Sequence, residues 1–453
     1  MTPHFLRCGV AWFVVSALMA CAPGAPPQPP GEPAIQPEPE VPGPTPDSGT
    51  PEGGSAPESG IPQVPPSSPS EKAPRIEDAA WEKLPLIDEG MSRGVTASAP
   101  RFDPSGQLWI ASARPNQIGD SLMGVLRWDG KTWKAEGSVS TEGRHSQGFS
   151  LALDDRGRML VGWTERSEKG SDPILLWRKD TGLMPSLQPW TPEERDRSSA
   201  GRVLSNAQGD IVYVWKEREA EGVHRTLRSL RLQGDTYVPF ATPLPVPDVS
   251  PDRNHPLNDT SVFALEDDGG LVAALFDPQV PSAQGLHLWR WHGDAWTELP
   301  PLPPVSGEDI VGFDVTADAG SLVVSRSREN AERLAVDVFR WKNGSWEALP
   351  YGVTVVRPLP HWGGFFAAVA VDAQQRVWLA HPRPEAEHND VQVMVWTGSS
   401  WQAVGQPLRG YAKPWYQHSV QLRVQGEWAA LAWSEPAMSG SSTVFVARFR
   451  ARP

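Results

Sequence analysis

Beyond residue 76, hydrophobic and polar positions recur in one pattern of short strands. Each unit has an apolar strand, a turn with Asp or Gly, a second apolar strand, a long variable loop, a third strand, a tight turn and an aromatic residue. Segments such as 158–163 and 376–380 are rich in β-branched and aromatic residues, which is typical of short strands. A unit that repeats in this way predicts an array of similar small sheets.

The turn between the first two strands of each unit gives a count of the units. It is occupied in order by Gly106, Gly157, Gly209, Gly269, Gly320, Gln375 and Gly426. The successive spacings of 51, 52, 60, 51, 55 and 51 residues fit one propeller blade each, with the variable loops absorbing the differences. We therefore expect an all-β fold, a single seven-bladed β-propeller of four-stranded blades over residues 76–453.

Most units end in two aromatic residues that flank a tight turn. The pairs are Trp128 with Trp133, Trp291 with Trp296, Trp341 with Trp346 and Trp396 with Trp401, and Leu232 with Tyr237 keeps the same spacing. Asp-Gly at 129–130 and Asn-Gly at 343–344 suit type I′ hairpins. Both members of a pair then fall on one face of the hairpin, so we interpret them as packing residues. Stacking on a sugar is the alternative.

The two ends of the repeat region are complementary. The chain stops after a third strand at 444–450, whereas residues 80–85 resemble the fourth strands at 295–300 and 345–350. We expect this N-terminal strand to complete the last blade, which would close the ring and protect an open sheet edge.

The first 20 residues have the profile of a signal peptide, with a positive charge at Arg7 and an uncharged apolar stretch at 9–20. Twelve apolar residues are too few to cross about 30 Å of hydrocarbon. Residues 18–21, Leu-Met-Ala-Cys, resemble the lipobox of bacterial lipoproteins. That resemblance implies a signal peptide at 1–20, acylation of Cys21 and, because Ala22 rather than Asp follows, retention at the outer membrane. An ordinary signal peptide that ends by chance in Cys is the alternative.

Residues 21–75 are expected to form the lipidated Cys and a disordered tether. Between 22 and 75 there are 18 Pro in 54 residues and no aromatic residue, a composition that cannot form a core. A ligand for proline-recognition domains is the alternative. The only other Cys, Cys8, lies in the segment to be removed, so the mature chain can form no internal disulfide.

The charge of the chain excludes some partners. It has 41 basic and 54 acidic side chains, a net charge of −13, and removal of residues 1–21 takes one Arg and no acid, giving 40 minus 54, or −14. Nucleic acid is therefore not an expected partner, and attachment to the bilayer must come from the acyl chains on Cys21. We expect a monomer.

In repeat length the chain resembles kelch-type propellers, and Asp103 with Gly-Gln-Leu-Trp-Ile at 106–110 resembles the repeats of bacterial sensor propellers. Among the turns that mark the units, the Gly-Gly doublet of kelch repeats occurs only at 269–270. The resemblance implies an architecture and no activity, because function depends on sites rather than folds.

No catalytic, cofactor or metal motif is present in the sequence, and we expect neither a cofactor nor a metal. Function concentrates on elaborated loops, and the long connections all lie on one face. Their aromatic and imidazole side chains suit ligand contact, although surface histidines and core-capping aromatics are the alternatives. The candidates are His145, His255, Asp259, His361, Trp362, Tyr411, Trp415, Tyr416 and His418. The acidic doublets at 154–155 and 267–268 suggest either calcium or, as we prefer, turn carboxylates that bond backbone amides.

The sequence thus favours a lipid-anchored binding or scaffold module that recognises a glycan or an envelope protein through one propeller face, rather than an enzyme. Two alternatives stay open, a glycan hydrolase or lyase and an accessory subunit of an envelope complex. An enzyme predicts a deep central pocket with convergent charged groups, and a binding module predicts a shallow aromatic rim.

Overall fold

A computed structural model of the chain places residues 68–453 in one compact unit. It describes residue 76 and the ranges 79–87, 96–115, 121–141, 145–154, 157–167, 170–179, 182–185, 198–218, 225–247, 257, 260–281, 284–305, 307–330, 332–350, 354–356, 367–384, 389–410, 419–436 and 442–451. The part of the chain so described contains no helix with the length and hydropathy needed to cross a membrane.

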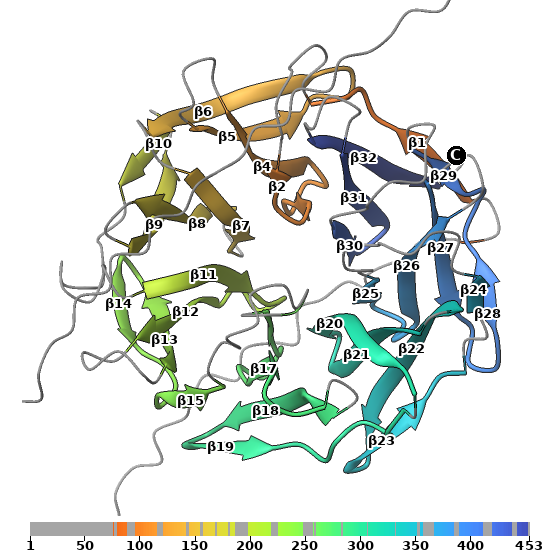
Figure 1. The fold of residues 1–453 in the computed structure, drawn as a ribbon. Helices are drawn as coiled ribbons and strands as arrows, with labels where there is room; N and C mark the ends of the chain where they lie inside the picture. Colours follow the sequence, from red (N-terminus) through yellow and green to blue (C-terminus); the bar gives the residue numbers. More distant parts are fainter. Residues whose placement is uncertain are drawn as a thin grey trace, which may run out of the picture. The chain divides into compact units, whose positions relative to one another are not determined.

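The described residues form antiparallel sheets arranged around a central axis, which is a β-propeller (Figure 1). Seven hydrogen-bonded sheets are present in these residues. The first contains β2 (Thr96–Ala97), β4 (Leu108–Pro115), β5 (Ser121–Trp128) and β6 (Trp133–Thr141), with β3 (Arg101–Phe102) also on β4. The second contains β7 (His145–Leu153), β8 (Met159–Ser167), β9 (Gly170–Lys179) and β10 (Gly182–Pro185).

The next two sheets follow in chain order. The third contains β11 (Ser198–Ser205), β12 (Ile211–Arg218), β13 (Arg225–Gln233) and β14 (Thr236–Pro239), with β15 (Leu244–Val246) on β13. The fourth contains β16 (Ser261–Leu265), β17 (Leu271–Phe276), β18 (Leu286–His292) and β19 (Ala295–Glu298).

The last three sheets complete the arrangement. The fifth contains β20 (Asp309–Asp318), β21 (Ser321–Glu329), β22 (Arg333–Lys342) and β23 (Ser345–Ala348), with β24 (Thr354–Val356) on β22. The sixth contains β25 (Ala368–Val371), β26 (Val377–Pro384), β27 (Asn389–Trp396) and β28 (Trp401–Ala403), with β29 (Leu408–Arg409) on β27. The seventh contains β30 (Ser419–Gln425), β31 (Trp428–Pro436), β32 (Ser442–Ala451) and β1 (Ala79–Lys83).

The prediction of a propeller built uniformly from seven four-stranded blades is wrong, because four of the sheets contain a fifth short strand. In the fifth sheet β23 pairs only with residues 339–342 of β22, so the first half of that ten-residue strand needs another partner. The chain turns back, and β24 pairs with residues 333–335. Strands β15 and β29 do the same on β13 and β27. These three extra strands thus cover the part of an edge that an outer strand of three or four residues leaves open.

The turns that gave the count have the conformation expected of them. Gly106, Gly157, Gly209, Gly269, Gly320, Gln375 and Gly426 have φ angles of 79°, 72°, 81°, 87°, 69°, 59° and 56°. Positive φ is the region that favours Gly, and Gln375 adopts it at the one position where Gly is replaced. The carboxylate that opens each of two turns supports it locally. Asp103 accepts hydrogen bonds from the amides of residues 105 and 107, and Asp372 accepts them from residues 374 and 376.

The paired tryptophans are packing residues, as predicted. Members of each pair lie directly opposite each other in the ladder, with ring centroids 4.9 to 5.8 Å apart. The second member of each pair also donates its Nε1–H to a carbonyl that follows the outer strand of the preceding sheet. These bonds are Trp133 to Pro85 (3.0 Å), Trp296 to Thr242 (2.7 Å), Trp346 to Pro300 (2.7 Å) and Trp401 to Leu349 (3.4 Å).

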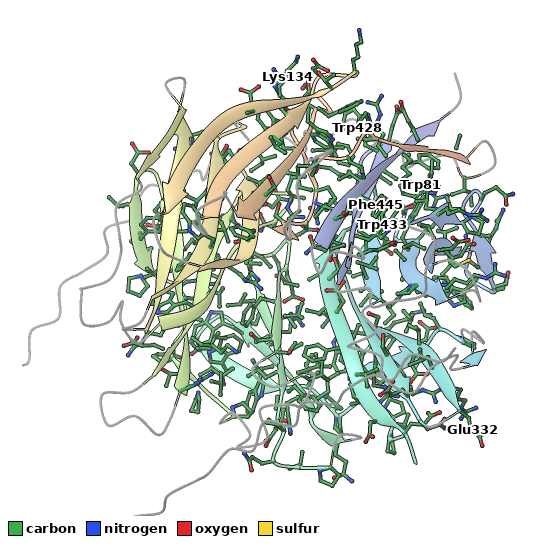
Figure 2. The ribbon with its side chains drawn as sticks, turned by 45° about the horizontal axis from the view of Figure 1, so that its top comes forward. Trp81, Lys134, Glu332, Trp428, Trp433 and Phe445 are labelled. Atoms are coloured by element: carbon green, nitrogen blue, oxygen red, sulfur yellow. The ribbon has the colours of Figure 1, made fainter. Side chains whose placement is uncertain are left out.

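The N-terminal strand pairs with the C-terminal one, as predicted. Strand β1 is antiparallel to β32, with Trp81 opposite Phe449 and their ring centroids 5.6 Å apart. Trp81 donates its Nε1–H to the Val404 carbonyl at 2.9 Å, which repeats the bond made by the other tryptophans. On the inner side of this sheet Trp433 stacks on Phe445 with centroids 5.1 Å apart (Figure 2). The same local chemistry therefore joins the chain ends and the internal sheets.

The hydrophobic core lies between the faces of successive sheets rather than at the axis. One buried cluster, for example, joins Ala264 and Val272 of the fourth sheet to Phe313 and Val324 of the fifth. The axis is lined instead by the edges of the inner strands. This arrangement leaves room for polar side chains at the centre.

Candidate functional site

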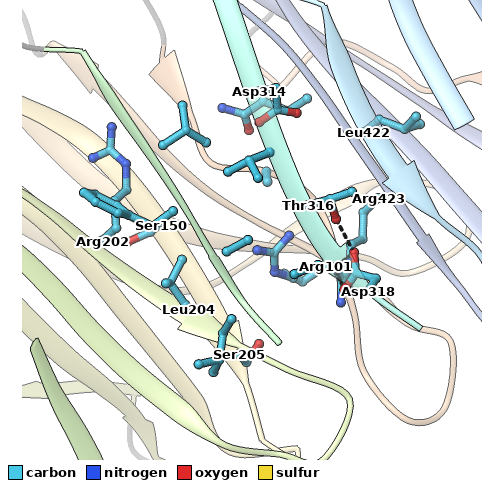
Figure 3. A pocket seen from close by; sticks show the side chains of 18 of the residues that line it. Arg101, Ser150, Arg202, Leu204, Ser205, Asp314, Thr316, Asp318, Leu422 and Arg423 are labelled. Carbon is cyan, nitrogen blue, oxygen red and sulfur yellow. Dashed lines mark hydrogen bonds and ion pairs between the residues drawn. The ribbon is translucent and has the colours of Figure 1, made fainter. Parts of the chain in front are cut away.

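A cavity of about 220 Å³ lies on the axis, between the inner strands (Figure 3). Consecutive inner strands β7, β11, β16, β20, β25 and β30 contact one another around it. Its walls are formed by residues 99, 101, 149–151, 202–205, 262–265, 314–318, 369 and 420–423. Every sheet contributes to it, so the cavity is held by the whole ring.

Five charged side chains are among the residues that line this cavity. They are Arg101, Arg202, Arg423, Asp314 and Asp318. With both carboxyls ionised, three positive and two negative charges leave a net charge of +1 in the cavity, whereas the chain as a whole carries −13. The cavity is therefore a local positive site in an acidic protein.

Three of these groups gather at the end of the cavity nearest the tight turns. Arg101, Asp318 and Arg423 lie on β3, β20 and β30, each a few residues before a turn. The Arg423 Nη1 donates to both carboxylate oxygens of Asp318, at 2.8 and 2.8 Å. Thr316 Oγ1 donates to Asp318 Oδ2 at 2.7 Å, shown as a dashed line in Figure 3. Asp318 is thus held in place by two neighbouring donors.

The two arginines of this group keep donors that have no acceptor. Arg101 donates from Nη1 to the Pro100 carbonyl at 3.2 Å. The Nε atoms of Arg101 and Arg423 are buried, and neither has a hydrogen-bond partner among the described residues. Burial, together with the nearby Arg423 charge, lowers the pKa of Arg101 to about 9, against the opposing effect of Asp318. A guanidinium with that pKa is still charged at neutral pH.

Asp314 lies farther along β20 from the same turn (Figure 3). Its Oδ2 accepts a hydrogen bond from the Val369 amide at 3.0 Å. Burial raises the pKa of its carboxyl to about 7, with a smaller contribution in the same direction from Asp318 and an opposing one from backbone donors. Near neutral pH the carboxyl is therefore divided between its neutral and ionised forms.

The loop residues predicted for ligand contact are not tested by the structure. Cys21, His255, Asp259, His361, Trp362, Tyr411, Trp415, Tyr416 and His418 lie outside the described residues. His145 begins β7, where its backbone pairs with Arg166, and its side chain is outside the description. The rim of loops stays a prediction.

The sequence analysis missed the charged residues of the inner strands. Asp314 sits within Val-Gly-Phe-Asp-Val-Thr-Ala-Asp, and Arg423 follows Val-Gln-Leu. A charged residue inside an otherwise apolar inner strand was the available signal.

Among the residues described, one group of possible metal ligands brings its atoms within 4.8 Å of one another, Glu266, Asp268 and His292. The guanidinium of Arg290 already lies there, with Nε 2.7 Å from Glu266 and Nη2 3.8 Å from Asp268. A resident cation of this kind disfavours a metal ion, so we assign no metal to the group.

The acidic doublets behave as turn residues where the structure describes them. Asp154 Oδ1 accepts the Arg158 amide of its own turn at 2.6 Å. Asp267 reaches further, accepting the amides of Ala207 at 3.4 Å and Gly320 at 3.1 Å from the turns of the two neighbouring sheets. The interpretation as carboxylates that bond backbone amides is confirmed for both, and residue 155 lies outside the described range.

Comparison with known proteins assigns the chain to no family, because no protein-family model and no curated protein matches it. Among solved structures it is similar to a Dyadobacter fermentans protein of unknown function, with 12% identity, 83% of this chain and 100% of that chain covered, and a TM-score of 0.47. The β-propeller domain of the Pyrococcus furiosus Trilobed protease gives 9% identity, 80% and 97% coverage and a TM-score of 0.44.

A third solved structure is a lectin. Aleuria aurantia lectin in complex with α-methyl-L-fucoside gives 11% identity, 72% of this chain and 98% of that chain covered, and a TM-score of 0.41. These similarities concern the fold.

Proposed function

We propose that this chain is an envelope-anchored binding protein that holds one unit of a glycan in the axial cavity of its propeller. The observation that carries this proposal is the axial cavity of about 220 Å³, which is lined by Arg101, Arg423 and Asp318. The two arginines make their hydrogen bonds within the described residues through Nη1 alone. Polar groups in a protein interior are normally hydrogen-bonded, so the remaining terminal N–H groups favour a ligand that completes them. The cavity is smaller than the roughly 300–1,000 Å³ of sites for drug-sized ligands, a size that suits a single sugar unit.

The proposed position in the cell rests on the N-terminal sequence. Leu-Met-Ala-Cys at 18–21 supports acylation of Cys21, and the Pro-rich residues 22–75 support a spacer between the lipid and the propeller. In this arrangement the bilayer is the anchor and not the ligand. An outer-membrane position follows from Ala22, by resemblance to other lipoproteins.

A glycan array with the full-length chain in detergent micelles tests the binding function. The cavity is blocked in Ser205→Trp, because Ser205 lines it and precedes a turn (Figure 3). The control is Lys134→Trp, which adds the same side chain to an exposed position of an outer hairpin. We expect the wild-type chain and Lys134→Trp to bind the same glycans of the array, and we expect Ser205→Trp not to bind them. A folded Ser205→Trp protein that binds all of these glycans would refute the proposal.

One observation favours a second candidate, a glycan-active enzyme. Asp314 lies in the cavity with a pKa raised to about 7 by burial, which suits a general acid or base near neutral pH. Asp318, by contrast, is paired with Arg423. Two carboxyls in different environments can divide acid and base roles.

The enzyme candidate is tested by incubating the full-length chain with the glycans that it binds on the array and measuring new reducing ends. We expect Asp314→Asn, which keeps the acceptor for the Val369 amide, to abolish release if Asp314 transfers a proton. Equal release by Asp314→Asn and the wild-type chain would exclude that role, and binding without release would leave the binding function alone.

A further inference from the structure

We propose that the ligand of the axial cavity is a monocarboxylate sugar, such as the uronic-acid unit of an acidic glycan, and that Arg101 and Arg423 bind its carboxylate. This inference rests on the proposed binding function and names the chemical class of the ligand. It is argued from the unmade hydrogen bonds, the charge and the size of the cavity.

The unmade donors call for an anionic acceptor. Arg423 uses Nη1 for both oxygens of Asp318, and Arg101 uses Nη1 for the Pro100 carbonyl. Each guanidinium has five N–H donors, and both arginines bond through Nη1 alone within the described residues, which leaves their Nη2 donors for a ligand. The planar fork of an arginine matches a carboxylate, and hydrogen bonds between ionised groups are the stronger ones. A carboxylate placed beside both arginines would complete their bonding.

The charge of the cavity favours an anion. The five charged side chains that line it sum to +1 when both Asp are ionised and to +2 when Asp314 is protonated. A carboxylate therefore reduces an excess of positive charge in either state. The raised pKa of Asp314 acts in the same direction, because a protonated Asp314 does not repel an anion.

A second polar side chain of the cavity suits a ligand that also carries a hydroxyl. Gln421 lines the cavity together with Arg423, and a side-chain amide can exchange hydrogen bonds with a hydroxyl. Gln421 and Arg423 are two residues apart on β30, so their side chains leave the same face of the strand about 6–7 Å apart. A bare carboxylate has no proton to give to Gln421. A ligand with a carboxylate at one end and a hydroxyl roughly one pyranose ring away satisfies both residues.

The test is isothermal titration calorimetry on the full-length chain in detergent micelles, with D-glucuronate, D-glucose and inorganic phosphate as probes. We expect D-glucuronate to bind, and D-glucose and phosphate to bind at least about tenfold more weakly. Arg101→Met, which removes the charge and keeps the bulk, should weaken D-glucuronate binding roughly ten- to a hundredfold. Arg101→Lys should give an intermediate loss, because it keeps the charge and removes the fork. Arg127→Met, on an outer hairpin, should leave binding unchanged.

Asp318→Asn distinguishes a binding role of the two arginines from a purely structural one, because only a binding role predicts tighter binding of the ligand. It removes the carboxylate that competes with the ligand and keeps acceptor and donor atoms for its neighbours, so D-glucuronate should bind several-fold more tightly. Melting temperatures of all variants identify any that fail to fold. Equal binding of D-glucose and D-glucuronate, tighter binding of phosphate, no binding of D-glucuronate, or no effect of Arg101→Met and Asp318→Asn would each overturn the proposal.

The two proposals fail in different ways. If the wild-type chain binds only neutral glycans and Ser205→Trp does not bind them, the binding function stands and the carboxylate assignment is wrong. If a folded Ser205→Trp protein binds every glycan that the wild-type chain binds, the cavity is not the site and both proposals fail.

Discussion

Replacing Trp81 measures how strongly the ends of the chain hold the ring closed. The indole is partly buried, packs edge-on against Phe449 and donates to the Val404 carbonyl at 2.9 Å. Losing the hydrogen bond costs about 1 kcal/mol, losing the aromatic pair costs about 1 kcal/mol, and the lost apolar burial costs about 1–2 kcal/mol. We therefore expect Trp81→Ala to lower the free energy of unfolding by about 3 kcal/mol, at the lower end of values for fully buried aromatics.

The measurement is urea unfolding followed by circular dichroism, combined with light scattering. Trp81→Phe should cost only about 1 kcal/mol, because it keeps the ring and loses the N–H donor. Trp346→Ala is the matched control, since Trp346 makes the same kind of bond, to Pro300, within the ring. Both Ala variants should be destabilised, but only Trp81→Ala should aggregate with rising concentration, because loosening β1 exposes the edge of β32. Unchanged unfolding midpoints for Trp81→Ala and for deletion of residues 76–88 would refute this account of closure.

Three further outcomes follow from the described contacts and the N-terminal sequence. Gly106→Ala should be more destabilising than Gly130→Ala in thermal unfolding, because both have positive φ but only at Gly106 would the new methyl lie 2.3 Å from the Trp428 ring; equal losses would contradict this packing. Because the folded pKa of Asp314 is about 7 against an ordinary 3.8, its contribution to stability should be complete below about pH 4 and decline as the pH rises to about 7. Asp314→Asn should flatten that decline in urea titrations, and a parallel pH profile would show that the group does not titrate there. Cys21→Ser should abolish acylation detected by mass spectrometry and release the chain from membranes, whereas continued membrane partitioning with acyl chains would disprove the anchor.

The blade pattern could be predicted because it depends on local chemistry that repeats. Turns at positions such as Gly106 and Gln375 need positive φ. An Asn-Gly or Asp-Gly turn places two aromatic residues opposite each other. Each unit can therefore be recognised from the sequence. The fifth strands could not be found in this way. Strand β29, for example, has two residues, too few for any periodicity, and it forms because the neighbouring edge of β27 is unpaired by β28.

The cavity could not be predicted because its groups meet only through the closed ring. Arg101 and Arg423 are separated by more than 300 positions of sequence, and Asp318 lies between them on a third strand. No spacing rule connects such residues, since their proximity depends on the order and number of the sheets. A charged side chain in an apolar inner strand indicates that something polar lies at the axis, and only the structure shows which of these side chains meet.

Closure through β1 also determines how the propeller would respond to mechanical load. Tension applied from the N-terminal side would reach Ile76, which is buried in the core, and then β1, which is held to β32 by antiparallel ladder bonds and to the preceding sheet by the indole of Trp81. Such tension would therefore act first on the strand that closes the ring, and not on the axial cavity.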